Sequence, residues 1–317
     1  MTILLLLVGL GLVVLGADWL VDGAGDIARR AGVGEFVIGL TIVGFGTSCP
    51  ELVVSLTGAF EGNAEVAVGN VIGSNIFNVL FILGITALLH PVGMTPENRR
   101  KDIPVCLGAT LLLLLAGMNH TLLGAGEKDA LSRIEGGVFL CLFGLYIYMA
   151  FRSSSRDGGS EEGTRPRSLI LSILLVLVGL GSLVAGGNLF VDSATLLARQ
   201  MGVSDKFIAL TILAGGTSLP ELATSVVAAL KGREQLALGN ILGSNVFNIL
   251  LILGSSALVA PLSLQAVTLV DGGVLLLSCV LLFVWAYSGR RLRIDRWEAL
   301  AMLSLFVAYY IYLFHKL

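Results

Sequence analysis

The chain has 317 residues, of which 56% are apolar and only 13% are charged. Soluble domains carry about twice this share of charged residues, so the composition excludes a soluble globular protein and indicates an integral membrane protein. The formal net charge is −2, and the basic residues are spread over short loops, which argues against nucleic-acid binding. The four cysteines are widely scattered, so neither a disulfide framework nor a zinc site is expected.

Ten mostly apolar runs have the length that a transmembrane helix needs, which is roughly 20 residues. They lie near residues 2–26, 34–60, 66–89, 103–119, 133–151, 168–197, 204–230, 236–260, 266–287 and 297–314. One long polar connection, rich in serine, glycine and charge, interrupts them at residues 152–167. We therefore expect five helices in residues 1–151, a solvated linker, and five helices in residues 168–317.

The two halves share a duplicated sequence at a constant offset of 170 residues. Residues 46–51 read Gly-Thr-Ser-Cys-Pro-Glu, and residues 216–221 read Gly-Thr-Ser-Leu-Pro-Glu. A second segment, Gly-Ser-Asn-x-x-Asn, ends at Asn78 in one half and at Asn248 in the other. Residues 41–91 align with 211–261 without a gap and are identical at 26 of 51 positions. This is an internal repeat, and function is expected where its copies meet.

An odd number of helices in each half predicts that the second repeat enters the membrane inverted relative to the first. Of the 20 basic residues, 15 fall in the loops on one side and five on the other. Because basic residues concentrate in cytoplasmic loops, the bias predicts a cytoplasmic central linker and two external termini. The first apolar run lacks a basic leader and a cleavage pattern, so we expect it to remain in the mature protein.

Each repeat places a glutamate inside an apolar helix, where an ionised carboxylate costs about 2.5–3.5 kcal/mol. Hydroxyls flank these glutamates at helical spacing, and amides and hydroxyls recur at the same spacing in the next helix of each repeat, which gives four polar stripes. The stripes are Thr47/Glu51/Ser55, Thr217/Glu221/Ser225, Asn70/Ser74/Asn78 and Asn240/Ser244/Asn248. They can converge on one place and supply carboxylate, hydroxyl and amide oxygens without imidazole or thiolate. Such a set suits hard cations such as Ca²⁺ or Na⁺.

Pro50 and Pro220 lack an amide hydrogen, so each is expected to break its helix and free carbonyl oxygens near Gly46 or Gly216. A plain kink repaired by a hydroxyl is the alternative interpretation of either copy alone. The duplicated glutamates favour a cation site.

The paired Gly-Thr-Ser-x-Pro-Glu and Gly-Ser-Asn-x-x-Asn segments resemble the alpha repeats of the cation/calcium exchanger superfamily, particularly the sodium/calcium exchangers. The resemblance extends over nearly the whole chain. The resemblance implies an all-α membrane fold of ten helices, with cation sites at the bilayer centre used alternately by Ca²⁺ and Na⁺. It implies that Glu51 and Glu221, with Thr47 and Thr217, form the calcium site. The flanking sodium sites would be lined by Ser48, Ser218, Ser74, Ser244, Asn78 and the carbonyls of Gly44 and Ala214. Asn248 is counted with them, although the family often has aspartate there.

We therefore expect a secondary antiporter of the cytoplasmic membrane that exchanges Ca²⁺ for Na⁺ by alternating access. A Ca²⁺/H⁺ antiporter with the same fold and a cation channel are the alternatives. Its partners would be the transported ions and the lipid bilayer, with no obligate protein partner and no cofactor. No enzymatic activity is expected, because the sequence carries none of the common hydrolase motifs.

Overall fold

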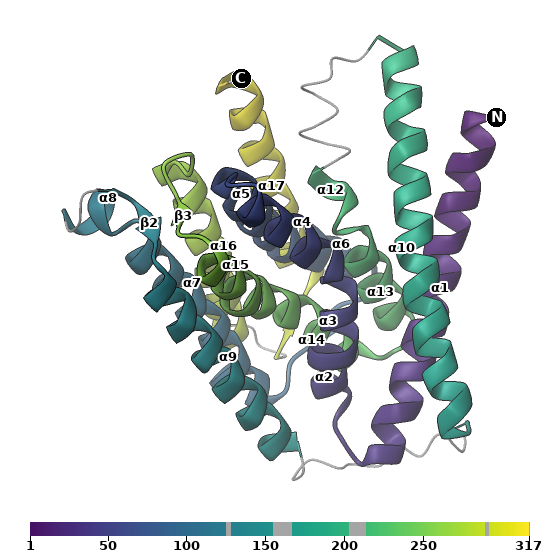
Figure 1. The fold of residues 1–317 in the computed structure, drawn as a ribbon. Coiled ribbons are helices and arrows are strands. Elements are labelled where there is room, and N and C mark those ends of the chain that lie inside the picture. The colour runs from purple at the N-terminus through teal and green to yellow at the C-terminus, as the bar shows by residue number, and fades with distance from the viewer. Residues whose placement is uncertain (125–127, 155–166, 203–213, 289–291, 317) are drawn as a thin grey trace. The chain divides into compact units, whose positions relative to one another are not determined.

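The computed structural model describes residues 1–124, 128–154, 167–202, 214–288 and 292–316, most of which are helical (Figure 1). They pack as two compact units, and each unit takes segments from both sequence repeats. The first unit comprises residues 1–50 and 149–241, and the second comprises residues 51–148 and 242–317. The linker predicted at 152–167 lies almost wholly outside the described residues.

The first unit is built around two long helices, with short helical segments packed against them. Its elements are α1 (Thr2–Ala31), α2 (Glu35–Ile38), the π-helical segment η1 (Gly39–Val43), α3 (Gly44–Thr47), α10 (Leu169–Gln200), α12 (Ala214–Gly216), α13 (Leu219–Leu230) and the start of α14 (Glu234–Val246). Helix α1 extends past the predicted end near residue 26, and it ends where Gly32 adopts a left-handed conformation with φ of 62°.

Helices α1 and α10 run side by side in opposite directions (Figure 1). A Cβ atom on Gly9 would lie 2.9 Å from the carbonyl oxygen of Gly186, and one on Gly16 would lie 2.8 Å from that of Gly179. Small residues let helix backbones approach closely in a membrane. The two pairs are related by the repeat, since Gly9 and Gly16 correspond to Gly179 and Gly186 at the offset of 170.

A network of ion pairs surrounds the C-terminal part of α1, with Asp22 at its centre. The Nζ atom of Lys231 lies 2.6 Å from Asp22 Oδ1, and Nη2 of Arg167 lies 3.1 Å from Asp22 Oδ2. Nearby, Arg29 pairs with Asp26 at 2.6 Å. These three cations belong to three segments that the basic-residue pattern assigns to one side of the membrane, and they share one end of the first unit.

Replacing Asp22 by asparagine is expected to lower the stability of the folded protein by about 1 kcal/mol, because partly exposed ion pairs are individually weak. The corresponding change at Asp192 is the matched control, since Asp192 is the repeat counterpart of Asp22 and its side chain is exposed. Thermal unfolding in detergent measures both variants. An equal loss of stability in the two variants would show that the ion pairs of Asp22 stabilise the protein no more than a single exposed charge does.

Within the described residues, the second unit contains the remaining helices and four short strands. Its elements are most of α4 (Cys49–Phe60), α5 (Ala64–Ile76), η2 (Phe77–Ile82), α6 (Leu83–Leu89), β1 (Val92–Gly93), η3 (Asn98–Asp102), α7 (Ile103–Gly117), α8 (Asn119–Leu123), β2 (Ala130–Leu131), most of α9 (Arg133–Ser154), the end of α14, η5 (Phe247–Leu253), α15 (Gly254–Val259), β3 (Leu262–Ser263), α16 (Leu269–Ser288), β4 (Arg293–Ile294) and α17 (Arg296–Lys316).

The strands form two antiparallel pairs that link the repeats. Strand β1 pairs with β4, and β2 pairs with β3. Each pair therefore joins one strand from the first half of the sequence to one strand from the second half. The all-helical expectation did not include these strands, which are two residues long and carry no alternating pattern that a sequence could reveal.

Within the described residues, seven helices are long and apolar enough to cross a bilayer, and the bent pair Glu35–Thr47 and Cys49–Phe60 makes an eighth. The other two predicted spans are less complete. Helix α7 has only 15 residues. The run predicted at 204–230 begins outside the described residues, and α12 and α13 cover its end. The multi-span membrane fold is thus established, whereas the count of ten stays a prediction.

Candidate cation site

The first copy of the repeated motif lies at a break between two helices. Helix α3 ends at Thr47, and α4 begins at Cys49 after a bend of 50°. Ser48, between them, has φ of −84° and ψ of 5°, outside the helical region. Pro50 explains the break, because its ring removes the amide hydrogen that would bond to the carbonyl of Gly46. The second copy repeats the arrangement, since Thr217 and Ser218 separate α12 from α13.

The two copies of the motif meet inside the first unit. The hydroxyl of Ser48 donates a hydrogen bond of 3.1 Å to Oε1 of Glu221, so a residue of the first motif contacts the carboxylate of the second. The hydroxyl of Thr47 donates to the amide oxygen of Asn240 at 3.2 Å. Glu221 is only 1% exposed and Thr47 is equally buried, so these polar groups are shielded from the bilayer.

One asparagine in each repeat donates a hydrogen bond to the backbone carbonyl of the glutamate. Nδ2 of Asn240 donates to the carbonyl oxygen of Glu221 at 3.3 Å and to Oγ of Ser225 at 2.9 Å. In the second unit, Nδ2 of Asn70 donates to the carbonyl oxygen of Glu51 at 3.3 Å and to Ser55 at 3.1 Å. Four members of the predicted stripes therefore hold the backbone of the two glutamates in place, namely Asn70, Ser55, Asn240 and Ser225.

Several buried oxygens of the predicted site are available to bind a cation. Within the residues that the structure describes, neither Oε2 of Glu221 nor Oγ1 of Thr217 has a hydrogen-bond partner, although both atoms are buried. Leaving a buried polar atom without a partner costs about 1–3 kcal/mol. A bound cation would satisfy such oxygens, which makes their arrangement consistent with an ion site.

The second unit contributes a group of four asparagines at the start of the π-helical segments η2 and η5. Asn78 donates to the amide oxygen of Asn245 at 3.2 Å, and Asn248 donates to that of Asn75 at 2.9 Å. All four side chains are 1% exposed. Single π-helical turns are frequent at functional sites, and here they occur at the same place in both repeats.

The predicted site residues divide between the two units. The first unit holds Gly44, Thr47, Ser48, Ala214, Thr217, Ser218 and Glu221. The second unit holds Glu51, Ser74, Asn78, Ser244 and Asn248. All of those whose side-chain exposure is described are buried, except Thr217, which is partly buried. Ala214 is the first residue of α12, at the edge of the described region, and only its backbone is described.

Two residues of this region were missed by the sequence analysis. Asn75 and Asn245 lie inside the repeated Gly-Ser-Asn-x-x-Asn segment, but their spacing sets them off the polar stripe that ends at Asn78 or Asn248. Their presence in both copies was the signal that could have identified them.

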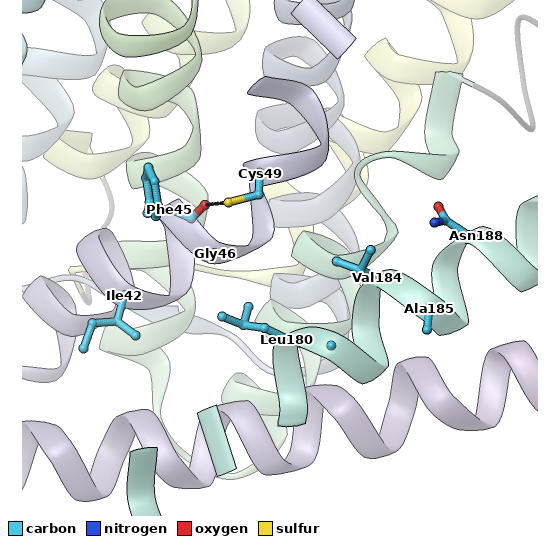
Figure 2. A pocket seen from close by; sticks show the side chains of 9 residues that line it. Ile42, Phe45, Gly46, Cys49, Leu180, Val184, Ala185 and Asn188 are labelled. Atoms are coloured by element: carbon cyan, nitrogen blue, oxygen red, sulfur yellow. Dashed lines mark hydrogen bonds between the residues drawn. The ribbon is translucent and has the colours of Figure 1, made fainter. Parts of the chain in front are cut away.

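An apolar hollow of about 810 Å³ lies in the first unit beside the helix break (Figure 2). It is lined by Phe45 and Cys49 on one side and by residues of α10, such as Leu180 and Val184, on the other. The Cys49 thiol donates to the carbonyl oxygen of Phe45 at 3.3 Å. The nearly apolar lining does not suit a cation, which distinguishes this hollow from the buried oxygen atoms described above.

Comparison with known proteins agrees with this architecture. A family model described as sodium/calcium exchanger protein matches residues 1–152 and 171–315. The sodium/calcium exchanger MaX1 of Methanosarcina acetivorans is 32% identical, over 98% of both chains. Inner membrane protein YrbG of Escherichia coli is 38% identical, over 81% of this chain and 79% of its own. A solved structure of the sodium-calcium exchanger NCX_Mj, soaked with zero Na⁺ and Ca²⁺, is 32% identical over 98% of both chains, with a TM-score of 0.83.

The membrane-spanning helices together with these matches define the class of the protein, which is an integral membrane cation antiporter. The family matches cover nearly the whole chain, and several relatives exceed 30% identity. The chain belongs to the sodium/calcium exchanger family.

Proposed function

We propose that this protein exchanges Ca²⁺ for Na⁺ across the cytoplasmic membrane by alternating access to one site near the bilayer midplane. The observation that carries the proposal is the hydrogen bond from Ser48 to Glu221, which joins the two copies of the motif at a buried helix break. Irregular backbone at membrane depth persists only where it is buried in protein or lines a cavity. The printed names of MaX1 and NCX_Mj support the choice of ions.

The proposed calcium ligands are the carboxylates of Glu51 and Glu221, with oxygens of Thr47 and Thr217. Two carboxylates balance the charge of one Ca²⁺, and Ca²⁺ prefers such oxygen ligands. Na⁺ would use the surrounding neutral oxygens together with the same glutamates. The proposed sodium ligands are Ser48, Ser218, Ser74, Ser244, Asn78, Asn248 and the carbonyls of Gly44 and Ala214. Sharing the glutamates makes the ions compete, and competition couples their movements.

The proposal places ten helices in the membrane as two inverted repeats of five, with both termini outside and the central linker in the cytoplasm. The antiparallel packing of α1 against its repeat counterpart α10 supports the inversion. The name of the relative YrbG supports the inner membrane. Because the ions are cargo, the proposed cycle needs no catalytic residue and no resident cofactor.

The purified protein in liposomes loaded with Na⁺ is expected to take up ⁴⁵Ca²⁺ when external Na⁺ is removed. Collapsing the Na⁺ gradient with an ionophore should stop the uptake, whereas a pH gradient alone should not drive it. Uptake that ignores Na⁺ and follows the pH gradient would replace sodium with protons as the coupling ion. Flux of Ca²⁺ down its own gradient without a counter-ion would instead indicate a channel.

If three Na⁺ move for each Ca²⁺, one net charge crosses the membrane in each cycle. A potential of 100 mV is then worth about 2.3 kcal/mol. In the same liposomes one positive charge leaves with each cycle, so an inside-positive potential is expected to increase Ca²⁺ accumulation and an inside-negative potential to reduce it. Valinomycin with defined K⁺ gradients sets the potential. Accumulation that does not change with potential would exclude this stoichiometry.

A further inference from the structure

The two predicted amide ligands are each held by an asparagine from the other repeat. Nδ2 of Asn78 donates to Oδ1 of Asn245, and Nδ2 of Asn248 donates to Oδ1 of Asn75. The offset of 170 residues converts the first contact into the second, so the arrangement is reciprocal. Each repeat thus supplies one of the proposed ligands, and the opposite repeat supplies the residue that contacts it.

The orientation of the second contact follows from a backbone group. Nδ2 of Asn75 donates to the carbonyl oxygen of Asn245 at 3.2 Å. A backbone carbonyl can only accept, so Asn75 must turn its amide nitrogen toward it and its oxygen toward Asn248. That oxygen accepts a hydrogen bond from Asn248. The end of the Asn248 amide that faces Asn75 must therefore be the nitrogen.

The first contact has the same direction, with a thiol in place of the backbone carbonyl. Nδ2 of Asn245 points toward Sγ of Cys106 at 3.9 Å, and Oδ1 of Asn245 accepts from Asn78. With Asn245 in this orientation its oxygen faces Asn78, so only the nitrogen end of the Asn78 amide can bond to it. In the structure each ligand amide therefore turns its nitrogen end toward the asparagine of the other repeat.

These contacts leave the oxygens of both ligand amides unused. Among the described residues, no group donates a hydrogen bond to Oδ1 of Asn78 or Oδ1 of Asn248, and both atoms are buried. A carboxamide has one oxygen and one nitrogen end, so occupying the nitrogen end determines which end is offered to an ion. Neutral amide oxygens are suitable ligands for Na⁺ and Ca²⁺, whereas an amide nitrogen would repel them.

We propose that Asn75 and Asn245 are positioning residues that hold the amide oxygens of Asn248 and Asn78 toward the transported cation. This inference rests on the proposed exchange function and adds residues that do not themselves bind the ion. It also explains why asparagine suits position 248. A carboxylate there would set one of its oxygens against Oδ1 of Asn75, which is acceptor against acceptor.

A double-mutant cycle tests the inference, using Asn245→Ala, Asn78→Asp and the combination of both. Asn245→Ala alone is expected to weaken Na⁺ binding about 10- to 100-fold, the usual cost of losing a residue that orients a ligand. The maximal exchange rate should change less than the half-saturating Na⁺ concentration. In the Asn78→Asp background the same change should cost no Na⁺ affinity, because both ends of a carboxylate are oxygen, no orientation has to be held, and losing Oδ1 of Asn245 relieves an acceptor-against-acceptor contact.

Two readouts are needed. Half-saturating Na⁺ is measured from ⁴⁵Ca²⁺ exchange in liposomes, and stabilisation by Na⁺ or Ca²⁺ alone is measured by thermal unfolding in detergent. An equal loss of affinity in both backgrounds would mean that Asn245 only supports the fold, and no loss in the parent background would also overturn the inference. The reciprocal cycle, Asn75→Ala with Asn248→Asp, provides a second test should Asn245→Ala not fold. A parent protein that binds the ions but does not exchange them would count against the proposed function and leave this cycle measurable.

Discussion

Replacing Glu221 by glutamine is expected to abolish Na⁺-dependent Ca²⁺ uptake while the protein still folds. Glutamine keeps the size of the side chain and an oxygen that can accept the hydrogen bond from Ser48. It removes one of the two charges that the proposed site sets against Ca²⁺. Loss of one partner of a buried charge pair costs about 2–5 kcal/mol, which is roughly 30-fold or more in affinity. Glu51→Gln is expected to behave in the same way.

Uptake of ⁴⁵Ca²⁺ into Na⁺-loaded liposomes measures this effect, and thermal unfolding checks that the variants are folded. Glu61→Gln is the matched control, since it removes a carboxylate that is exposed just after the end of α4. Exchange that persists in both Glu51→Gln and Glu221→Gln would show that neither glutamate binds the transported ion, and the proposed site would have to be abandoned.

Replacing Gly16 by alanine is expected to destabilise the folded protein by forcing α1 and α10 apart. The added methyl group would lie 2.8 Å from both the carbonyl oxygen of Gly179 and the amide nitrogen of Leu183. These are backbone atoms, so neither can turn aside as a side-chain end could. Overpacking of this kind costs about 1–3 kcal/mol, and the unfolding temperature should fall by several degrees, roughly 2–4 °C per kcal/mol.

The same helix provides a control. Gly11 has no atom within 4 Å of the place where its Cβ would lie, so Gly11→Ala should leave stability unchanged or raise it slightly. Thermal unfolding of the two variants in one detergent compares the same chemical change at two positions of one helix. If Gly16→Ala is as stable as Gly11→Ala, the close contact between α1 and α10 does not contribute to folding.

Much of the fold could be predicted because a membrane imposes strong rules on sequence. Runs of apolar residues predicted the long helices, and proline predicted the break that the structure places at Ser48. Helix ends were less accurate. Helix α1 continues to Ala31 because its last turns carry charged residues that pair with one another, so the helix outlasts the apolar run. The strand pairs were not predictable, since two residues give no periodicity.

The sequence suggested candidate ligands for a cation, but it did not identify the residues that hold them. Duplication identified both glutamates, because a carboxylate that recurs at the same place in two apolar helices requires a reason. It could not separate oxygens that face an ion from those that brace a helix. Ser55 and Ser225 share the glutamate face, yet the structure uses them to hold Asn70 and Asn240. That distinction depends on contacts between helices far apart in sequence, as does the orientation of every amide.

The exchange of strands between the two halves has a consequence for biosynthesis. Strand β1 is made early, but its partner β4 follows about 200 residues later, which takes roughly 10–40 s at 5–20 residues per second. During that interval the first five helices can be in the membrane while the backbone hydrogen bonds of β1 have no partner strand. Strand β2 waits in the same way for β3. A nascent chain that stops after the first repeat therefore lacks the partner strands of both β1 and β2. The unpaired backbone edges of these two strands are then exposed to the quality-control proteases of the cell.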